Sequence, residues 1–194
     1  MRVSVLGLGY VGAVSAGCLA EEGHEVVGVD PESRKVDLIN EGKTPIIEQE
    51  IGQIIERQVA AGRLSATTDV ASAVRRTDLI MICVGTPSRA NGDIDLKYVA
   101  RVCEQVGAAL RDHSGAPVVV VRSTMLPGTM RELVIPTLEA SSGKRAGIAA
   151  AHDSRAPGQT DGGAGGRGDA FLAAGEAEPL AGGRLHGDAR DVHA

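Results

Sequence analysis

Aromatic residues are nearly absent from this chain of 194 residues, which has two tyrosines, one phenylalanine and no tryptophan. Proteins that bind single-stranded nucleic acid stack the bases on aromatic rings, so such a platform is not expected. Lys and Arg number 20 against 25 Asp and Glu, which gives a net charge of −5. A basic surface that neutralises many phosphates is therefore not expected either, and we predict no nucleic-acid partner.

Long apolar runs and paired cysteines are also missing. No run approaches the roughly 20 apolar residues that span a bilayer, and the N-terminus lacks the pattern of a secretory signal, so we predict a cytoplasmic protein without membrane contact. The three cysteines, Cys18, Cys83 and Cys103, are widely spaced and have apolar neighbours, which indicates reduced packing residues. No Cys and His cluster has metal-ligand spacing, so we predict no metal site.

Residues 1–146 alternate apolar strand-like segments with helix-like segments. Such alternation predicts right-handed βαβ units and an α/β domain with a doubly wound parallel (Rossmann-type) sheet. The expected strands are residues 2–7, 25–30, 64–67, 79–84 and 118–121. The expected helices are residues 10–22, 33–42, 51–62, 69–74, 95–110 and 129–138, with Ser33, Asp69 and Asp95 as N-caps of three of them.

The composition changes after residue 146. Residues 151–194 contain ten Gly and ten Ala among 44 positions, and neither a helical nor a strand period survives. Such a segment buries too little apolar surface to offset its ordering entropy, so we expect 147–194 to be a disordered tail, with a short helix at 171–178 as an alternative there. The sheet would then be incomplete at its C-terminal edge, with strand 118–121 exposed.

A glycine-rich turn joins the first expected strand to the first expected helix, because Gly7-Leu-Gly-Tyr-Val-Gly12 fits the pattern G-x-G-x-x-G. The first glycine permits a tight turn, Gly9 lets the backbone approach a diphosphate, and Gly12 allows close packing of helix on sheet. The helix that begins near Tyr10 directs unpaired N–H groups at the diphosphate. Because a strand precedes the turn and a helix follows it, the pattern predicts dinucleotide binding rather than an ordinary glycine turn.

Asp30 follows Gly12 by 18 residues and ends the second expected strand. A carboxylate at this point accepts hydrogen bonds from the adenosine ribose hydroxyls and repels a 2′-phosphate, which favours NAD over NADP. The nearby Arg34 and Lys35 soften this preference without reversing it.

Small polar residues follow the fourth and fifth expected strands as well. The carboxyl ends of parallel strands share one edge of the sheet, where ligands of open α/β folds bind. Thr86 and Thr124 are therefore candidates to line the nicotinamide half of the groove, and the alternative is that they are plain turn residues.

Together these residues resemble the N-terminal, NAD-binding domain of the UDP-glucose/GDP-mannose dehydrogenase family. The matching stretches are Gly7-Leu-Gly-Tyr-Val-Gly12, Gly23-His-Glu-Val-Val-Gly-Val-Asp30, Lys35-Val-Asp-Leu-Ile-Asn40, Pro45-Ile46, Cys83-Val-Gly-Thr-Pro87 and Arg122-Ser-Thr-Met-Leu-Pro-Gly-Thr129. Residues 91–96 and 126–129 are closer to the GDP-mannose branch than to the UDP-glucose branch.

The resemblance implies a two-step, four-electron oxidation, in which the C6 alcohol of a nucleotide sugar becomes an aldehyde and then a carboxylate while two NAD are reduced. It implies cofactor contacts at Tyr10, Val11, Asp30, Lys35, Thr86 and Thr124. The family's catalytic cysteine, lysine and asparagine lie beyond the end of this chain, so we predict no catalytic residue within it. Family members are dimers through segments that this chain lacks, so the resemblance leaves its oligomeric state open.

The chain departs from the family at two places. Glu48-Gln-Glu-Ile51 stands where the family has Glu-Pro-Gly-Leu, which we expect to alter only a surface turn. The family's Asn-Pro-Glu-Phe-Leu-Arg-Glu segment does not follow Gly147, which suggests a frameshifted or truncated gene; a family-like continuation in another reading frame would support this. Two alternatives stay open: a stand-alone NAD-binding or sensing module, and another dehydrogenase of the hydroxyacid or 6-phosphogluconate type.

Overall fold

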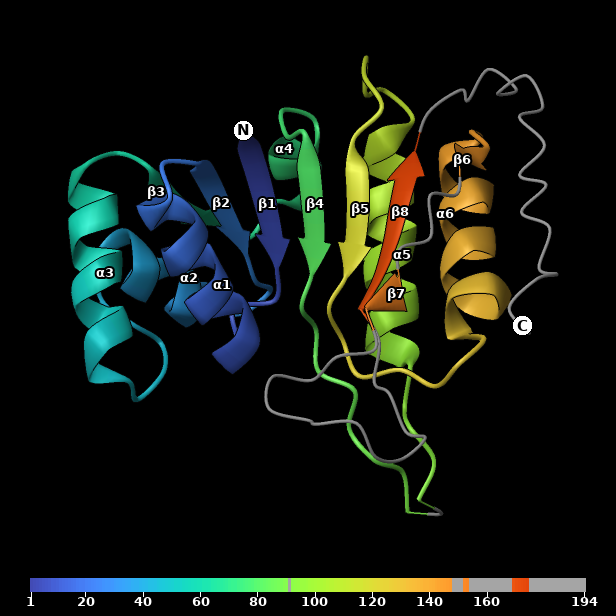
Figure 1. The fold of residues 1–194 in the computed structure, drawn as a ribbon, viewed down its shortest axis with the longest axis horizontal. Coiled ribbons are helices and arrows are strands. Elements are labelled where there is room, and N and C mark those ends of the chain that lie inside the picture. The colour runs from blue at the N-terminus through green and yellow to red at the C-terminus, as the bar shows by residue number, and fades with distance from the viewer. Residues whose placement is uncertain (91, 148–151, 154–168, 175–194) are drawn as a thin grey trace, which may run out of the picture.

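The computed structural model describes residues 1–90, 92–147, 152–153 and 169–174. Its centre is a sheet in which five parallel strands follow the order β3-β2-β1-β4-β5, so the predicted doubly wound α/β fold is confirmed (Figure 1). These strands are β1 (Arg2–Leu6), β2 (Glu25–Val29), β3 (Leu64–Thr67), β4 (Leu79–Ile82) and β5 (Val118–Val121). The order reverses between β1 and β4, which is where such sheets open a ligand crevice.

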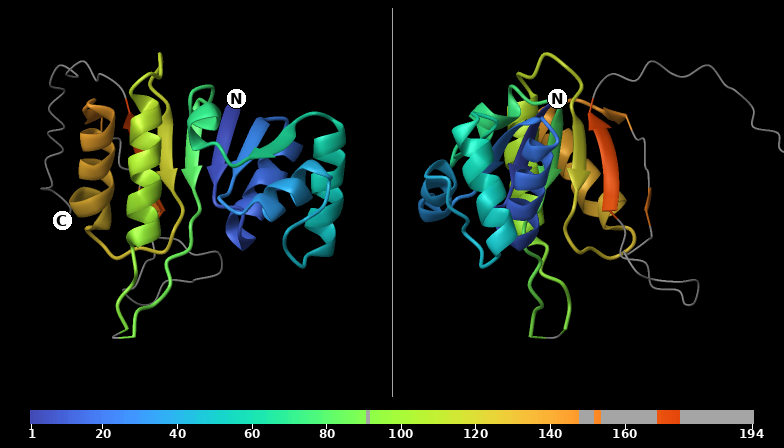
Figure 2. Two further views of the ribbon diagram at one scale, coloured as in Figure 1. Left: turned by 180° about the vertical axis from the view of Figure 1, so that it is seen from behind. Right: turned by 60° about the vertical axis from the view of Figure 1, so that its left-hand side comes forward.

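Helices cover both faces of this sheet, and each face has its own apolar core. On one face Val3 and Val5 of β1 pack with α1 (Tyr10–Glu21) and α3 (Gln49–Ala60). On the other face Leu6 packs with α4 (Val70–Val74), α5 (Lys97–Leu110) and α6 (Ile135–Ser142). In Figure 1, α1 lies in front of the sheet, and in the reverse view in Figure 2, α5 lies in front of it. Strands buried on both faces must be apolar throughout, which explains the sequence of β4 and β5.

Of the three residues predicted to be helix N-caps, the structure confirms one. Asp69 caps α4, and its carboxylate accepts the N–H groups of Ala71 and Ser72 at 2.9 and 3.2 Å. The prediction for Ser33 is wrong, because α2 (Ser33–Asn40) already begins there and Glu32 precedes it. The prediction for Asp95 is displaced by one residue: the N-cap of α5 is Leu96, although Asp95 accepts the N–H of Lys97 at 3.1 Å.

The helix expected at 129–138 consists of two kinds of turn. A π-helical segment, η1 (Met130–Val134), continues into α6, whose C-cap residue is Gly143 with a φ of +70°. Pro136 lies in the first turn of α6 and has no N–H to donate to a carbonyl four residues earlier. The missing donor favours the wider π turn before it.

A strand from the C-terminal part covers the edge of the sheet. β8 (Asp169–Ala174) pairs antiparallel with β5, and β6 (Ala146–Gly147) and β7 (His152–Asp153) pair with β8. The expected exposed edge at β5 is therefore wrong, and so is the helix at 171–174. The physical reason is that free N–H and C=O groups on an edge strand favour pairing with an extended segment. Residues 148–151, 154–168 and 175–194, on which most of the predicted tail falls, lie outside the described residues.

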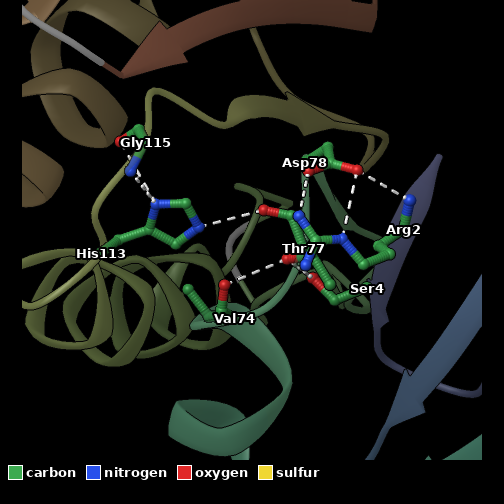
Figure 3. Close-up of polar contacts among 7 residues, drawn as sticks. All are labelled: Arg2, Ser4, Val74, Thr77, Asp78, His113 and Gly115. Carbon is green, nitrogen blue, oxygen red and sulfur yellow. Dashed lines mark hydrogen bonds and ion pairs between the residues drawn. The ribbon is translucent and has the colours of Figure 1, made fainter.

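Polar side chains hold the opposite, amino-terminal edge of the sheet together (Figure 3). Arg2 donates to both carboxylate oxygens of Asp78, from its backbone N–H at 2.9 Å and its guanidinium at 2.8 Å. These hydrogen bonds lower the pKa of Asp78 to about 2. His113 lies 3.1 Å from the carbonyl oxygen of Thr77, so it links the end of α5 to the start of β4.

Candidate functional site: a groove at the carboxyl edge of the sheet

A groove of about 390 Å³ lies at the carboxyl ends of β1, β2 and β4. Its lining includes Gly7, Gly9, Asp30 and Lys35, so the structure brings together four of the predicted site residues. The full lining is Leu6, Gly7, Gly9, Val29, Asp30, Pro31, Lys35, Thr68, Val70, Cys83, Val84, Gly85, Pro87, Tyr98, Arg101, Val102 and Gln105.

The three glycines of the turn meet three different steric conditions. Gly7 has a φ of +98°, and a Cβ there would lie 2.8 Å from the carbonyl oxygen of Cys83. A Cβ on Gly12 would overlap the carbonyl oxygen of Gly7. A Cβ on Gly9 would meet nothing within 4 Å, so this residue presents bare backbone to the groove. The first and third glycines are therefore required by the fold, whereas the second leaves space for a ligand.

The first turn of α1 faces this space with its positive end. Gly9 caps the helix in an extended conformation, and no acidic residue follows in the first turn. The N–H groups of Tyr10 and Val11 have no acceptor within the helix, and the aligned peptide dipoles add a partial positive charge. Both side chains point outward, since they are 60% and 42% exposed. Such an end attracts a phosphate group.

Glu48 connects the start of α1 to α3. The hydroxyl of Tyr10 donates to Glu48 Oε1 at 2.9 Å, and this hydrogen bond raises the pKa of Tyr10. Glu48 is also the N-cap residue of α3. Glu48 itself is common to this chain and the family pattern. The residues that depart from the pattern, from Gln49 to Ile51, begin α3, and Ile51 is buried in the core, so the departure lies at the start of a helix rather than only in a surface turn.

Asp30 is 5% exposed and its carboxylate is held from three sides. Leu8 donates its N–H to Oδ2 at 2.8 Å, and Glu32 donates its N–H to Oδ1 at 3.0 Å. The ammonium of Lys35 lies 3.4 Å from Oδ2 and 3.3 Å from Glu32 Oε2. These contacts fix the direction of the carboxylate at the end of β2, and they tie the glycine turn to the start of α2.

The other five predicted site residues do not line the groove: Tyr10, Val11, Gly12, Thr86 and Thr124. Thr86 follows β4 and is partly buried, and Thr124 follows β5 and is exposed. Their neighbourhood is nevertheless fixed: Ser123 donates to the carbonyl of Val84 at 2.8 Å, and Arg122 donates to the hydroxyl of Ser15 at 3.0 Å. The ends of β4 and β5 are thus joined to each other and to α1.

Sequence reasoning missed one wall of the groove, which belongs to α5. The wall residues, Tyr98, Arg101, Val102 and Gln105, follow the spacing i, i+3, i+4, i+7 of one helical face. That spacing, with polar residues at three of the four positions, is the sequence pattern that could have indicated a groove-lining face on α5. The prediction that Cys18 packs in the interior is also wrong, because Cys18 is exposed, while Cys83 and Cys103 are buried.

The remaining structural findings concern metals and membranes. In the part of the chain that the structure describes, no group of three or more His, Cys, Asp or Glu side chains could hold a metal ion. None of the helices described is long and apolar enough to cross a membrane.

Comparisons with known proteins agree with this geometry. Residues 1–157 match the UDP-glucose/GDP-mannose dehydrogenase family, NAD binding domain. The GDP-mannose 6-dehydrogenase of Azotobacter vinelandii is 57% identical over 148 residues, which are 76% of this chain and 34% of that protein. The UDP-glucose 6-dehydrogenase of Rhizobium meliloti is 40% identical over 134 residues, or 69% of this chain and 30% of that protein.

A solved structure shows the same arrangement. The ternary complex of GDP-mannose dehydrogenase from Pseudomonas aeruginosa has a TM-score of 0.75 and 55% identity, covering 76% of this chain and 34% of that one. The chain thus spans about a third of the length of the relatives it matches. The bare backbone at Gly9, the free helix end beyond it and the carboxylate of Asp30 fit the diphosphate and a ribose of NAD. With its fold, its glycine turn and these matches in agreement, the chain belongs to the UDP-glucose/GDP-mannose dehydrogenase family and contains that family's NAD-binding domain.

Proposed function

We propose that this chain supplies the NAD-binding part of a nucleotide-sugar 6-dehydrogenase whose substrate is GDP-mannose rather than UDP-glucose. The observation that carries the cofactor half is the groove, whose lining includes Asp30 and the open backbone of Gly9. The relatives named GDP-mannose 6-dehydrogenase are more similar to the chain than the UDP-glucose enzyme is, which supports the choice of sugar nucleotide. We also propose a cytoplasmic location, which suits three cysteines that form no disulfide among the described residues.

Each predicted site residue has a proposed task. The backbone of the glycine turn and the first turn of α1 binds the diphosphate, and Asp30 with Lys35 binds the adenosine ribose. We assign Thr86 and Thr124, which follow the carboxyl ends of β4 and β5, to the nicotinamide half of the cofactor. The diphosphate group is bound at Gly7, Gly9, Tyr10, Val11 and Gly12.

NAD supplies the redox chemistry when bound, because its nicotinamide ring accepts a hydride. In the proposed reaction the C6 alcohol of the nucleotide sugar is oxidised to a carboxylate in two such steps. The residues of this chain bind and orient the cofactor and exclude water from its diphosphate. We assign no catalytic group to the chain.

The test measures binding first and turnover second. Calorimetry with NAD should give a saturable signal, and absence of binding would overturn the proposal. An assay at the absorbance band of reduced NAD, with GDP-mannose and UDP-glucose, follows. Binding without turnover agrees with a cofactor-binding part, or with a stand-alone module that needs no chemistry. Turnover would show that catalytic groups are present after all, and turnover with UDP-glucose alone would overturn the choice of GDP-mannose.

A further inference from the structure

The turn between β2 and α2 carries a cation that two carboxylates hold in place. Lys35 Nζ lies 3.4 Å from Asp30 Oδ2 and 3.3 Å from Glu32 Oε2. The backbone supports the same arrangement, since Lys35 donates its N–H to the carbonyl of Glu32 at 3.0 Å. Asp30 and Lys35 line the groove. The three charged groups therefore form one cluster around Asp30, the residue that we propose binds the adenosine ribose.

The two carboxylates differ in what else they do. Asp30 is nearly buried and also accepts the N–H groups of Leu8 and Glu32, so the fold depends on it. The side chain of Glu32 is 56% exposed, and its carboxylate contacts Lys35 alone among the contacts that the structure describes. Glu32 is thus the member of the cluster that can be neutralised without disturbing the glycine turn.

The charges within the cluster determine how a 2′-phosphate would interact with this part of the groove. Partial burial lowers the pKa of Lys35, but the charge of Asp30 and the hydrogen bonds that Lys35 donates to Glu32 and Asp30 outweigh this and raise the pKa. Lys35 is therefore a charged ammonium already engaged by two anions. A 2′-phosphate, which carries a charge of about −1.5 to −2 at neutral pH, would meet these two carboxylates while Lys35 stays engaged with them.

We propose that Glu32 is a specificity-determining residue, which holds Lys35 against Asp30 and so keeps a cofactor with a 2′-phosphate out of the groove. This inference rests on the proposed NAD-binding function and deepens it. Lys35 can donate hydrogen bonds to ribose hydroxyls while it is paired with the two carboxylates. To bind a 2′-phosphate, Lys35 would have to leave these carboxylates. The preference for NAD then depends on two carboxylates, only one of which, Asp30, was apparent as an NAD determinant from the sequence.

The experiment compares Glu32→Gln with a matched control, Glu41→Gln. Glu41 makes a similar lysine pair, to Lys43 at 2.8 Å, but neither residue lines the groove. Each substitution removes one negative charge from one lysine pair, so the net charge of the two variants is equal. Calorimetry measures the Kd of NAD and of NADP for both variants and for the unchanged chain, at low and at high salt.

We expect Glu32→Gln to lower the Kd of NADP about three- to tenfold at low salt, while the Kd of NAD changes less than about twofold. The gain should shrink at high salt because the site is partly exposed. Glu41→Gln should change neither Kd. The double substitution Glu32→Gln with Lys35→Met should lose the gain, since the freed ammonium is then missing.

The outcomes separate this inference from the proposed function. If NAD binds but NADP binds Glu32→Gln no more tightly than Glu41→Gln, including no binding to either, the inference is overturned while the proposed function stands. A gain that persists in the double variant overturns the role of Lys35. If NAD does not bind the unchanged chain, the proposed function itself fails and the inference fails with it.

Discussion

Asp30 combines two tasks in one side chain, since its oxygens hold the glycine turn and are proposed to bind the ribose. Replacement of Asp30 by Ala should weaken the binding free energy of NAD by about 1–3 kcal/mol, which is the contribution of hydrogen bonds to a charged acceptor. Calorimetry measures the change. The control is Asp112→Ala, which removes an exposed carboxylate beyond the end of α5. Equal NAD affinity in the two variants would remove Asp30 from the site.

Gly9 and Gly12 lie three residues apart, but substitution should affect NAD binding at Gly9 and folding stability at Gly12. Gly9→Val should fold normally, because its backbone is extended and nothing lies within 4 Å, yet NAD should bind more than about tenfold more weakly since the side chain occupies diphosphate space. Gly12→Ala should lower the free energy of unfolding by at least about 2 kcal/mol, because its Cβ overlaps a backbone carbonyl. Urea unfolding and calorimetry on both variants provide the measurements. A destabilised Gly9→Val or a fully stable Gly12→Ala would contradict this division of roles.

At the scale of single elements, α4 is a helix of five residues that depends on its N-cap residue, Asp69. Asp69 accepts two N–H groups there, and these backbone hydrogen bonds lower its pKa. Asp69→Ala should therefore lower the urea midpoint more than Ser33→Ala does, because Ser33 lies inside α2 and caps nothing. Equal midpoints would show that the cap does not stabilise α4.

The pairing of β1 with β4 should respond to acid through Asp78. Its folded pKa of about 2 lies below the ordinary 3.8, so its contribution to stability is complete above pH 4 and is lost as the pH falls toward 2. Asp78→Asn should be less stable than the unchanged chain at pH 6, and the difference should narrow at pH 2.5. Urea unfolding at the two pH values tests this, with Asp112→Asn as the control. A difference independent of pH would contradict the role of the Arg2 contact.

At the scale of the whole molecule, the described residues form a sheet with one ligand groove at its carboxyl edge and a polar network at its amino edge. A ligand that binds only the folded state raises its stability, by about 2.7 kcal/mol at a concentration of 100 times Kd. NAD should therefore raise the thermal midpoint in a concentration-dependent way, and Gly9→Val should abolish the effect. An equal rise in that variant would place NAD outside the groove.

Local features of the sequence were sufficient to predict much of this protein. The alternation of apolar strands and helices predicted the doubly wound sheet. The glycine turn with Asp30 predicted the cofactor half of the site, because a turn, a free helix end and the residue that ends a strand are defined by neighbouring residues. The groove contains Gly7, Gly9, Asp30 and Lys35, as expected from these patterns.

Tertiary structure decided the contacts between residues distant in sequence. It placed the face of α5 along the groove, left Thr86 and Thr124 outside its lining, and paired β8 with β5. It also decided the state of Lys35, which the sequence showed only as a nearby cation and which the fold pairs with Asp30 and Glu32. Periodicity and motifs define the direction of a segment, but which side chains meet depends on how helices and strands pack, and that is fixed only when the chain has folded.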